Sequence, residues 1–434
     1  MTTLASMGSA LSAQPATEPR APIAVVGMGV KTPVGLTLDT FWNGLCAGVS
    51  AAGPITLFDT SEHPVTFACE VSDLDLDAYI TPKDAAHLDR VSHLGYAAAA
   101  DALTHAGDLG TDPARIAVVA GTGVGGLITL EKEISKYVEK GAMRVSPFLV
   151  PMMMSNATAA YIAIRHGFTG PNFSVVTACA AGGNAIGEAM RLLRAGDADI
   201  VIAGGSEASI TPVGLAAFNR MTALSRRKDD PAHASRPFDK DRDGFVMGEG
   251  AGFVVLERWD RAQARGARIY GGIAGYGRNS DAHHITLPSP GGEGAVRCMQ
   301  LALDDAGLTA ADIGHVNAHG TSTPANDLAE AEAITKVFGG TPPPVTSVKG
   351  VTGHLIGAAG AVEAIASLLA MDRGMLFPTA NHIEPDAAMP AIDLVVGAPR
   401  PLAPAPALSN SFGFGGHNAC LVLIPGPAAV GAGR

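Results

Sequence analysis

A single cysteine stands at a corner of the stretch VVTACAAGGNAIG, residues 175–187. Residues 173–177 form a short apolar run that predicts a buried strand, and from residue 180 onward apolar side chains recur at helical spacing. Cys179 would therefore lie near the N–H groups that begin a helix, where the helix dipole favours the thiolate. This position suits a nucleophile, although a lone cysteine is more often a buried structural residue.

Two histidines lie in turn-rich stretches farther along the chain. His319 is in the motif NAHGTSTP, after a short apolar run and before a proline that would start a helix. His354 is in SVKGVTGHLIGAAGAVEA (347–364), five residues after Lys349 and nine before Glu363. Taken one at a time, a histidine of this kind is usually structural, and the lysine would be an ordinary solvated loop residue.

Together, one cysteine, two histidines, a lysine and a glutamate define a possible carbon–carbon bond-forming reaction. The thiolate of Cys179 would accept an acyl group as a thioester. Two neutral imidazoles would donate hydrogen bonds to the carbonyl of a second thioester, and so stabilise the enolate that forms when a carboxylate leaves as CO2. Lys349 would position His354 and keep it neutral through its charge, and Glu363 would orient the loop.

The stretch SNSFGFGGHNA (409–419) is predicted to be a Gly-rich loop between two strand-like runs. Its aromatic residues Phe412 and Phe414 would plug a core or a pocket. Backbone N–H groups at Cys179 and in this loop would suit an oxyanion hole. The spacing of the cysteine and histidine residues matches no zinc pattern, so no metal is predicted.

A second Gly-rich stretch, GTGVGG (121–126), follows a predicted strand and fits the pattern G-x-G-x-x-G. A dinucleotide site would also need an acidic residue at the end of a second strand about 20 residues on, and the sequence has none there. We therefore reject a dinucleotide site. The turn is expected to allow close packing instead.

Composition narrows the function classes. The chain has 434 residues, of which 47% are hydrophobic and 16% charged, as in a globular protein with a large core. A net charge of −11 argues against generic nucleic-acid binding, although a local basic patch can still bind an acidic partner. Candidates for such a patch are Arg220, Arg226, Arg227 and Lys228.

The location of the protein is predicted from three features. Five scattered cysteines suggest no disulfide framework. The first 20 residues lack the pattern of a signal peptide, and no apolar run is long enough to span a membrane. We expect a cytoplasmic protein.

Short β-branched runs that predict strands alternate with Ala-rich helical stretches, which predicts an α/β fold with largely buried sheets. These runs are 23–30, 116–120, 199–205, 252–257, 315–320, 345–350 and 418–424. The segment ALTHAG to IAVVAGTG (102–123) is echoed 200 residues later by ALDDAG to IGHVNAHGTST (302–323). This echo predicts two similar halves packed as one unit, with a site at their seam. The predicted boundaries are a disordered lead at 1–21, halves at 22–266 and 267–425, and a flexible tail at 426–434.

Four ordered motifs, TACAAG, NAHGTSTP, VKGVTGHLIGAAG and NSFGFGGHNA, occur together with SRPFDKDRDGFVMGEGAG (235–252). In this combination they resemble the elongating bacterial β-ketoacyl-acyl-carrier-protein synthases, the synthase II type, from about residue 22 to 425. The resemblance implies a thiolase fold, with duplicated α/β halves in a five-layered αβαβα arrangement, normally as a dimer. It also implies an acyltransferase that performs decarboxylative Claisen condensation of malonyl carrier protein with an acyl chain, without a cofactor of its own.

Carried over residue by residue, the resemblance makes Cys179 the acylated nucleophile. His319 and His354 would bind the malonyl thioester carbonyl and promote decarboxylation. Lys349 and Glu363 match the supporting lysine and glutamate of the family.

The resemblance also assigns residues to the substrate arm and the oxyanion hole. Thr321 and Thr323 match threonines that contact the phosphopantetheine arm of the acyl carrier protein. Phe414 matches a gating phenylalanine, whose backbone N–H would join that of Cys179 in the oxyanion hole.

The sequence departs from the fatty-acid pattern at several positions. Ala86, His87 and Thr222 stand where family members often carry basic residues that dock the acidic carrier protein. Basic residues remain at Lys83, Arg226 and Arg227. Asn326 replaces a usual glycine, and its Asn-Asp pair resembles the ketosynthase subunits of type II polyketide systems. Fatty-acid elongation by a homodimer and polyketide extension beside a chain-length-factor subunit therefore both stay open.

Two other classes are weighed against this interpretation. Thiolases and initiation-type synthases use a second cysteine, or a Cys/His/Asn set, whereas this chain has two histidines in the matching contexts. A non-catalytic partner subunit that only shapes the acyl tunnel typically lacks the nucleophile. The joint presence of Cys179, His319 and His354 favours an active enzyme.

Overall fold

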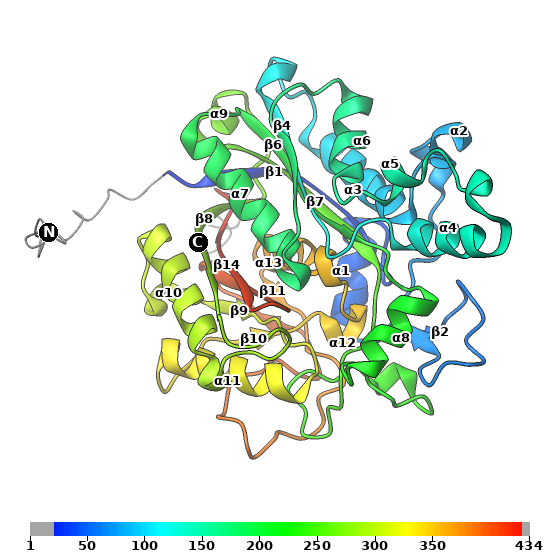
Figure 1. Cartoon of the computed structure of the whole chain (residues 1–434). Helices are drawn as coiled ribbons and strands as arrows, with labels where there is room; N and C mark the ends of the chain where they lie inside the picture. Colours follow the sequence, from blue (N-terminus) through cyan, green and yellow to red (C-terminus); the bar gives the residue numbers. More distant parts are fainter. Residues whose placement is uncertain (1–20, 428–434) are drawn as a thin grey trace, which may run out of the picture.

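The computed structural model describes residues 21–427 (Figure 1). The predicted lead and tail lie outside this range, apart from residue 21 and residues 426–427. One continuous ten-stranded sheet has the order β10-β9-β13-β14-β8-β1-β7-β6-β4-β5. Its strands are β1 (Ile23–Lys31), β4 (Ile116–Gly121), β5 (Asn172–Val175), β6 (Ile200–Glu207), β7 (Gly250–Arg258), β8 (Gly271–Ser280), β9 (His315–Asn317), β10 (Val345–Thr346), β13 (Ala407–Gly413) and β14 (His417–Pro425).

The strand order repeats on either side of the central pair β1 and β8. Outward from this pair, the sheet runs β7-β6-β4-β5 on one side and β14-β13-β9-β10 on the other. The directions match as well: β4 is parallel to β5 and β6, β9 is parallel to β10 and β13, and the remaining neighbours are antiparallel. The topology thus contains the duplication that the sequence echo predicts. The exact boundary at 266/267, between α9 and β8, stays a prediction.

The two halves of the sheet form two β layers, and helices form a layer between them and a layer on each outer face. Helices α7 (Ala181–Ala195) and α13 (Ala359–Arg373) pack against strands of both halves of the sheet, in the middle of the molecule (Figure 1). Helices α3 (Arg90–Ala106) and α6 (Ala157–His166) cover the outer face of one half, and α10 (Glu293–Ala306) and α11 (Pro324–Phe338) cover the other. The predicted αβαβα arrangement is confirmed.

Shorter elements connect and flank these layers. The helices are α1 (Leu38–Ala47), α2 (Pro82–Ala85), α4 (Leu127–Lys140), α5 (Leu149–Met153), α8 (Pro212–Arg220), α9 (Trp259–Ala264) and α12 (Lys349–Thr352). The strands are β2 (Gly53–Pro54), β3 (Phe67–Ala68), β11 (Met375–Leu376) and β12 (Arg400–Pro401). Within residues 21–427, none of the helices is both long and apolar enough to cross a lipid bilayer.

Glycines in the two central strands let the outer helices approach the sheet closely. A Cβ atom at Gly27 or Gly29 of β1 would lie 2.1 Å from a backbone oxygen of α3. A Cβ atom at Gly275 or Gly277 of β8 would lie 2.2 or 2.1 Å from a backbone oxygen of α10. The same spacing on both strands is a further trace of the duplication. It also makes β8 so rich in glycine that its sequence did not predict a strand.

Three local predictions were wrong at least in part. The run at 173–177 overlaps a strand, as predicted, but this strand, β5, lies at the edge of the sheet, and Phe173 is 37% exposed instead of buried. Most of the predicted loop at 409–419 belongs to β13 and β14, joined by a tight turn at residues 414–416. The predicted strand at 345–350 ends at Thr346, and Lys349 begins α12.

Candidate functional site

Cys179 lies in a strained turn between β5 and α7. A single turn of 3₁₀-helix, Ala178–Ala180, joins the strand to the helix, and Ala178 has a φ of 50°. This left-handed conformation is unfavourable for a residue with a side chain, so the surroundings must hold the turn in place. Such strain often marks a functional site.

The electrostatics of the thiol differ from the sequence prediction. Burial raises the pKa of Cys179 to about 11, against the lowering expected from the start of α7. The positive charge of Lys349 and a hydrogen bond from the backbone N–H of Phe414 lower this pKa in part. The resting side chain is therefore a protonated thiol, and the groups that favour a thiolate are already in place around it.

His319 and His354 face each other across the site. Their ring centroids are 5.3 Å apart with an interplanar angle of 84°, and both side chains are buried. Burial, followed by the positive charge of Lys349, lowers the pKa of each imidazole well below its usual value. Both rings are neutral at physiological pH, and each can donate one N–H to a substrate.

Lys349 contacts His319, not His354 as predicted. Its Nζ atom lies 3.3 Å from Nδ1 of His319, also donates to the His319 carbonyl, and forms a buried ion pair with Glu363 on α13. The difference arises because Lys349 begins a helical turn instead of ending a strand, so its side chain reaches the end of β9. Its charge still helps to keep His354 neutral.

The contact with Lys349 fixes the tautomer of His319. An ammonium group has only donors, so Nδ1 of His319 must accept. The single ring proton of the neutral imidazole is then on Nε2, which is free to donate. Glu363 holds the ammonium from the other side, and burial raises the pKa of this carboxyl.

One pocket of about 250 Å³ gathers most of the predicted site residues. Its walls include Cys179, His319, His354, Thr321, Thr323 and Phe414. Lys349 and Glu363 do not line the pocket but stand behind the histidines. Aromatic and aliphatic side chains, among them Phe218 and Ile356, form much of the remaining wall.

The tight turn at 414–416 brings a backbone donor to the thiol. Glycines at 415 and 416 adopt positive φ angles of 82° and 72°. A Cβ atom at Gly413 would lie 2.7 Å from the carbonyl oxygen of Thr177, so β13 can approach the cysteine turn only with a glycine there. The backbone N–H groups of Phe414 and Cys179 both act on the Cys179 sulfur, which is the arrangement that an oxyanion hole at this cysteine needs.

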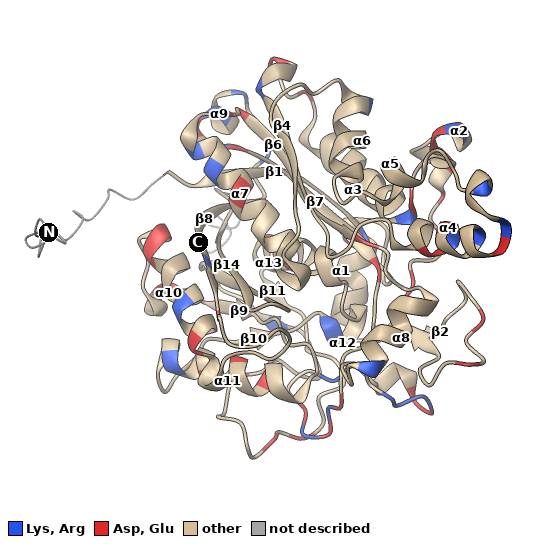
Figure 2. Ribbon diagram, viewed as in Figure 1, with Lys and Arg blue, Asp and Glu red and all other residues tan. Residues whose placement is uncertain are grey.

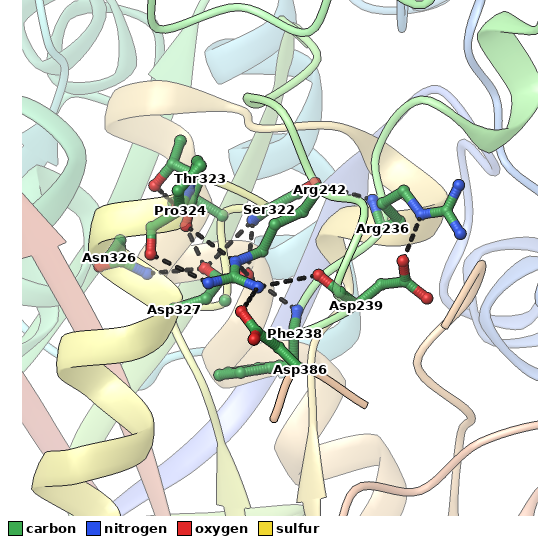
Figure 3. Close-up of polar contacts among 12 residues, drawn as sticks. Arg236, Phe238, Asp239, Arg242, Ser322, Thr323, Pro324, Asn326, Asp327 and Asp386 are labelled. Atoms are coloured by element: carbon green, nitrogen blue, oxygen red, sulfur yellow. Dashed lines mark hydrogen bonds and ion pairs between the residues drawn. The ribbon is translucent and has the colours of Figure 1, made fainter. Parts of the chain in front are cut away.

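The loop that carries Thr321 and Thr323 is anchored by a buried carboxylate. The two threonine hydroxyls are 2.9 Å apart. Asp327 accepts from the N–H of Ser322 at 3.1 Å and from the N–H of Phe238 at 2.8 Å (Figure 3). Ser322 and Phe238 have positive φ angles of 69° and 63°, so Asp327 stabilises two strained residues at once.

Arg242 ties the same loop to two other segments. Its guanidinium donates to Asp386 at 2.7 Å and to the carbonyl of Pro324 at 3.1 Å (Figure 3). The 235–252 motif also holds one histidine in place, because the backbone N–H of His354 donates to the backbone carbonyl of Val246 at 2.8 Å. The motif is therefore a support for both the threonine loop and His354.

Two buried glutamates near the pocket were not assigned a role from sequence. Glu330 accepts from the N–H groups of His319 and Gly320, each at 2.8 Å. Glu207, at the end of β6, accepts from the N–H of Gly123 at 2.6 Å and of Gly357 at 3.1 Å. The only signal for Glu207 in the sequence is its position, as an acidic residue just after a predicted buried strand.

The GTGVGG turn packs closely, as the sequence predicts. A Cβ atom at Gly123 would lie 2.7 Å from Oε2 of Glu207 and 2.8 Å from the side chain of Ile356. Burial raises the pKa of Glu207 to about 7, and its charge in turn opposes ionisation of Cys179. Glu207 thus joins three loops around the nucleophile.

Replacing Glu207 by glutamine is expected to flatten the pH dependence of folding stability. Folding raises the pKa of this carboxyl from 4.5 to about 7, so the folded state binds the proton more tightly. The resulting stabilisation is complete below about pH 4.5 and is lost as the pH rises through about 7, a change of about 3 kcal/mol. Urea unfolding at pH 5.5 and pH 8 measures about 2 kcal/mol of this change. The exposed Glu62→Gln variant should keep the wild-type slope, and an unchanged slope in Glu207→Gln would contradict the assignment.

Comparison with known proteins decides the family. Residues 20–262 match the family described as "Beta-ketoacyl synthase, N-terminal domain", and residues 270–382 match "Beta-ketoacyl synthase, C-terminal domain". The chain belongs to the β-ketoacyl synthase family. A relative named 3-oxoacyl-[acyl-carrier-protein] synthase 2, from Synechocystis sp., is 47% identical over 407 residues, which cover 92% of this chain and 97% of that protein.

Solved structures agree with this assignment to a β-ketoacyl synthase. The ishigamide ketosynthase/chain length factor has a TM-score of 0.88 and 36% identity, over 94% of this chain and 99% of the other. A type II polyketide synthase acyl-carrier protein in complex with its ketosynthase bound to the hexaketide has a TM-score of 0.85 and 28% identity, over 94% and 99%. The thiolase fold is confirmed. Among residues 21–427, no group of three or more His, Cys, Asp and Glu side chains is arranged to hold a metal.

Proposed function

We propose that this condensing enzyme joins malonyl carrier protein to an acyl chain bound at Cys179, with loss of CO2, to give 3-oxoacyl carrier protein in fatty-acid elongation. One observation carries the proposal. A buried thiol and two neutral imidazoles line the same pocket of about 250 Å³, and the Lys349–Glu363 pair lies behind them. The named relative at 47% identity supports the same reaction.

In the first half-reaction, the Cys179 sulfur attacks the acyl thioester. Its proton leaves as the C–S bond forms, and Lys349 and the Phe414 N–H stabilise the negative charge on sulfur. The N–H groups of Cys179 and Phe414 bind the oxyanion of the tetrahedral intermediate. The pantetheine thiolate then leaves and takes up the proton that Cys179 gave up, which leaves the acyl group on the enzyme.

In the second half-reaction, His319 and His354 donate hydrogen bonds to the malonyl thioester carbonyl. As the bond to the carboxylate breaks and CO2 departs, the electron pair moves into an enolate that these N–H groups stabilise. The enolate carbon attacks the acyl-cysteine carbonyl and forms the new C–C bond. The Cys179 thiolate leaves and takes up a proton from the solvent. Neutral imidazoles suit this role because each keeps a donor without holding a charge in a buried site.

The phosphopantetheine arm would enter past Thr321 and Thr323, whose hydroxyls lie in the pocket wall. The acidic carrier protein would dock at the rim, where the pocket-lining segment 221–223 is flanked in sequence by the exposed basic residues Arg220 and Arg226. Figure 2 shows Lys residues on α4, interspersed with Glu residues. The partner is an acyl carrier protein in this proposal, and no cofactor is needed beyond the arm it carries.

A second thiolase-fold chain would pair with the edge strand β5. Phe173 and Val176 are 37% and 51% exposed beside this edge. Val150 of α5 and Ile164 of α6 add further exposed apolar surface. An open strand edge with apolar side chains is a ready surface for pairing. A homodimer is the first candidate, and a chain-length-factor homologue is the second.

The alternative function is chain extension as the ketosynthase subunit of a type II polyketide synthase. Asn326 supports this alternative, because it begins the Asn-Asp pair that resembles polyketide ketosynthase subunits. It lines the pocket, and its Nδ2 atom donates to Asp327 at 3.1 Å. The likeness to a ketosynthase/chain length factor supports it as well. The higher identity to a 3-oxoacyl carrier protein synthase 2 places fatty-acid elongation first.

A cytoplasmic location is part of the proposal. All five cysteines, Cys46, Cys69, Cys179, Cys298 and Cys420, are free. Free thiols are typical of a reducing compartment.

Intact-protein mass spectrometry of the purified chain, after incubation with acyl carrier proteins that carry different acyl groups, tests the function. We expect saturated long acyl groups to add to Cys179 without any partner subunit. Addition of polyketide-like chains alone, or only after a partner is supplied, would favour the alternative. No acylation under either condition would contradict both.

A further inference from the structure

A chain of hydrogen bonds runs from the cysteine turn to strand β8. The Thr177 hydroxyl donates to Oδ1 of Asn184 at 2.7 Å, and Nδ2 of Asn184 donates to the Tyr276 hydroxyl at 2.9 Å. The Tyr276 hydroxyl donates in turn to Oε1 of Glu188 at 3.2 Å. We call these four side chains the Thr177 relay. Because two of them lie on α7 and Tyr276 lies on β8, the relay joins the inner helix to the central pair of strands.

Every proton in the relay points the same way, toward the carboxylate of Glu188. That carboxylate is held by ion pairs with Arg278 and, at 3.7 Å, with Arg191. Hydrogen bonds aligned in one direction and ending on a fixed anion polarise and strengthen one another. Asn184 and Tyr276 are buried, so loss of one member would leave the next without a partner.

Packing fixes the Tyr276 hydroxyl over α7. A Cβ atom at Gly187 would lie 2.4 Å from the Tyr276 ring, so the ring can cross the helix only because this position is glycine. Gly187 and Glu188 are three and four residues after Asn184, on the same face of the helix. The tyrosine therefore reaches Asn184 and Glu188 together.

The relay ends at the strained turn that carries the nucleophile. Thr177 directly precedes Ala178, whose φ is 50°, and Cys179. Thr177 lines a second pocket of about 450 Å³, whereas Cys179 lines the reaction pocket. The turn thus lies between two pockets, and the Thr177 hydrogen bond fixes it on the side that faces the second pocket.

We propose that Tyr276 is a positioning residue for the condensing reaction, which acts through Asn184 and Thr177 to hold the Cys179 thiol and N–H in place. The inference rests on the proposed function for its reaction. Its geometry is independent of the substrate, because none of the four relay side chains lines the reaction pocket.

The test is the rate of acyl transfer to Cys179 in a Tyr276→Phe variant, which loses the hydroxyl and keeps the ring. We expect the rate at saturating acyl carrier protein to fall about tenfold, at an unchanged half-saturating concentration. Thr177→Val should behave alike, and the double variant should be no slower than the slower single one, because the relay acts as a unit. Thr177→Ser, which keeps the hydroxyl, should retain the wild-type rate. Tyr270→Phe, outside the relay, serves as the matched control and should also retain it.

A wild-type rate in Tyr276→Phe, or losses that multiply in the double variant, would overturn the proposal. The rate at which iodoacetamide alkylates Cys179 separates the relay proposal from the proposed function. If no acyl carrier protein acylates the wild-type protein but the relay variants still alter alkylation, the function fails and the relay stands. If acyl transfer occurs and both assays ignore the variants, the relay fails and the function stands.

Discussion

Replacement of Cys179 by alanine is expected to abolish 3-oxoacyl carrier protein formation, with a loss on the order of 10⁴-fold. No other cysteine of the described chain lines the reaction pocket, so no nearby sulfur can take over the acyl group. Mass spectrometry should find no acyl adduct on the variant. Release of CO2 from malonyl carrier protein should remain detectable, because the two imidazoles that bind the thioester carbonyl are untouched.

A matched control for this variant is Cys69→Ala. Cys69 is a buried thiol in the same apolar cluster as Cys179 but does not line the pocket. It should keep acylation and condensation near wild-type rates. Condensation that survives in Cys179→Ala, or an adduct found on another residue, would remove the thioester step from the mechanism.

Much of the fold follows from local sequence patterns. The β-branched runs of β1, β4, β6, β7 and β14 were recognised because such residues fill a strand buried on both faces. The two strands of the ten-stranded sheet that were missed, β8 and β13, carry glycine, serine and asparagine where helix α10 or the cysteine turn comes close. Close approach of backbones removes the very side chains on which a strand prediction depends. The edge position of β5 is a property of the whole sheet and has no local signal.

The site shows the same division. The motifs predicted that Cys179, His319 and His354 belong together, and the pocket gathers them. The predicted partner of Lys349, His354, was wrong, because the choice between the two histidines depends on whether residue 349 ends a strand or begins a helix. The relay from Thr177 to Tyr276 spans 99 positions between two halves of the fold. No pattern in one stretch of sequence could reveal it.

Replacement of Lys349 by methionine is expected to destabilise the fold and to stop decarboxylation. Glu363 would then remain as a carboxylate without its cation, in a helix that is buried along almost its whole length. Breaking a buried ion pair in this way costs about 3–5 kcal/mol. Burial already raises the pKa of Glu363, and without Lys349 this pKa rises further, so the loss of stability should grow as the pH increases. Urea unfolding at pH 6 and pH 8 measures this effect.

The double variant Lys349→Met/Glu363→Leu separates stability from chemistry. With both charges removed, no buried carboxylate is left without its cation, and most of the lost free energy of unfolding should return. CO2 release should stay at least about 100-fold below wild type, because no ammonium then fixes the Nε2–H tautomer of His319. Recovery of activity together with stability would mean that Lys349 serves only the fold. Stability without activity would instead assign to the ammonium the electrostatic role that its contact with Nδ1 of His319 predicts.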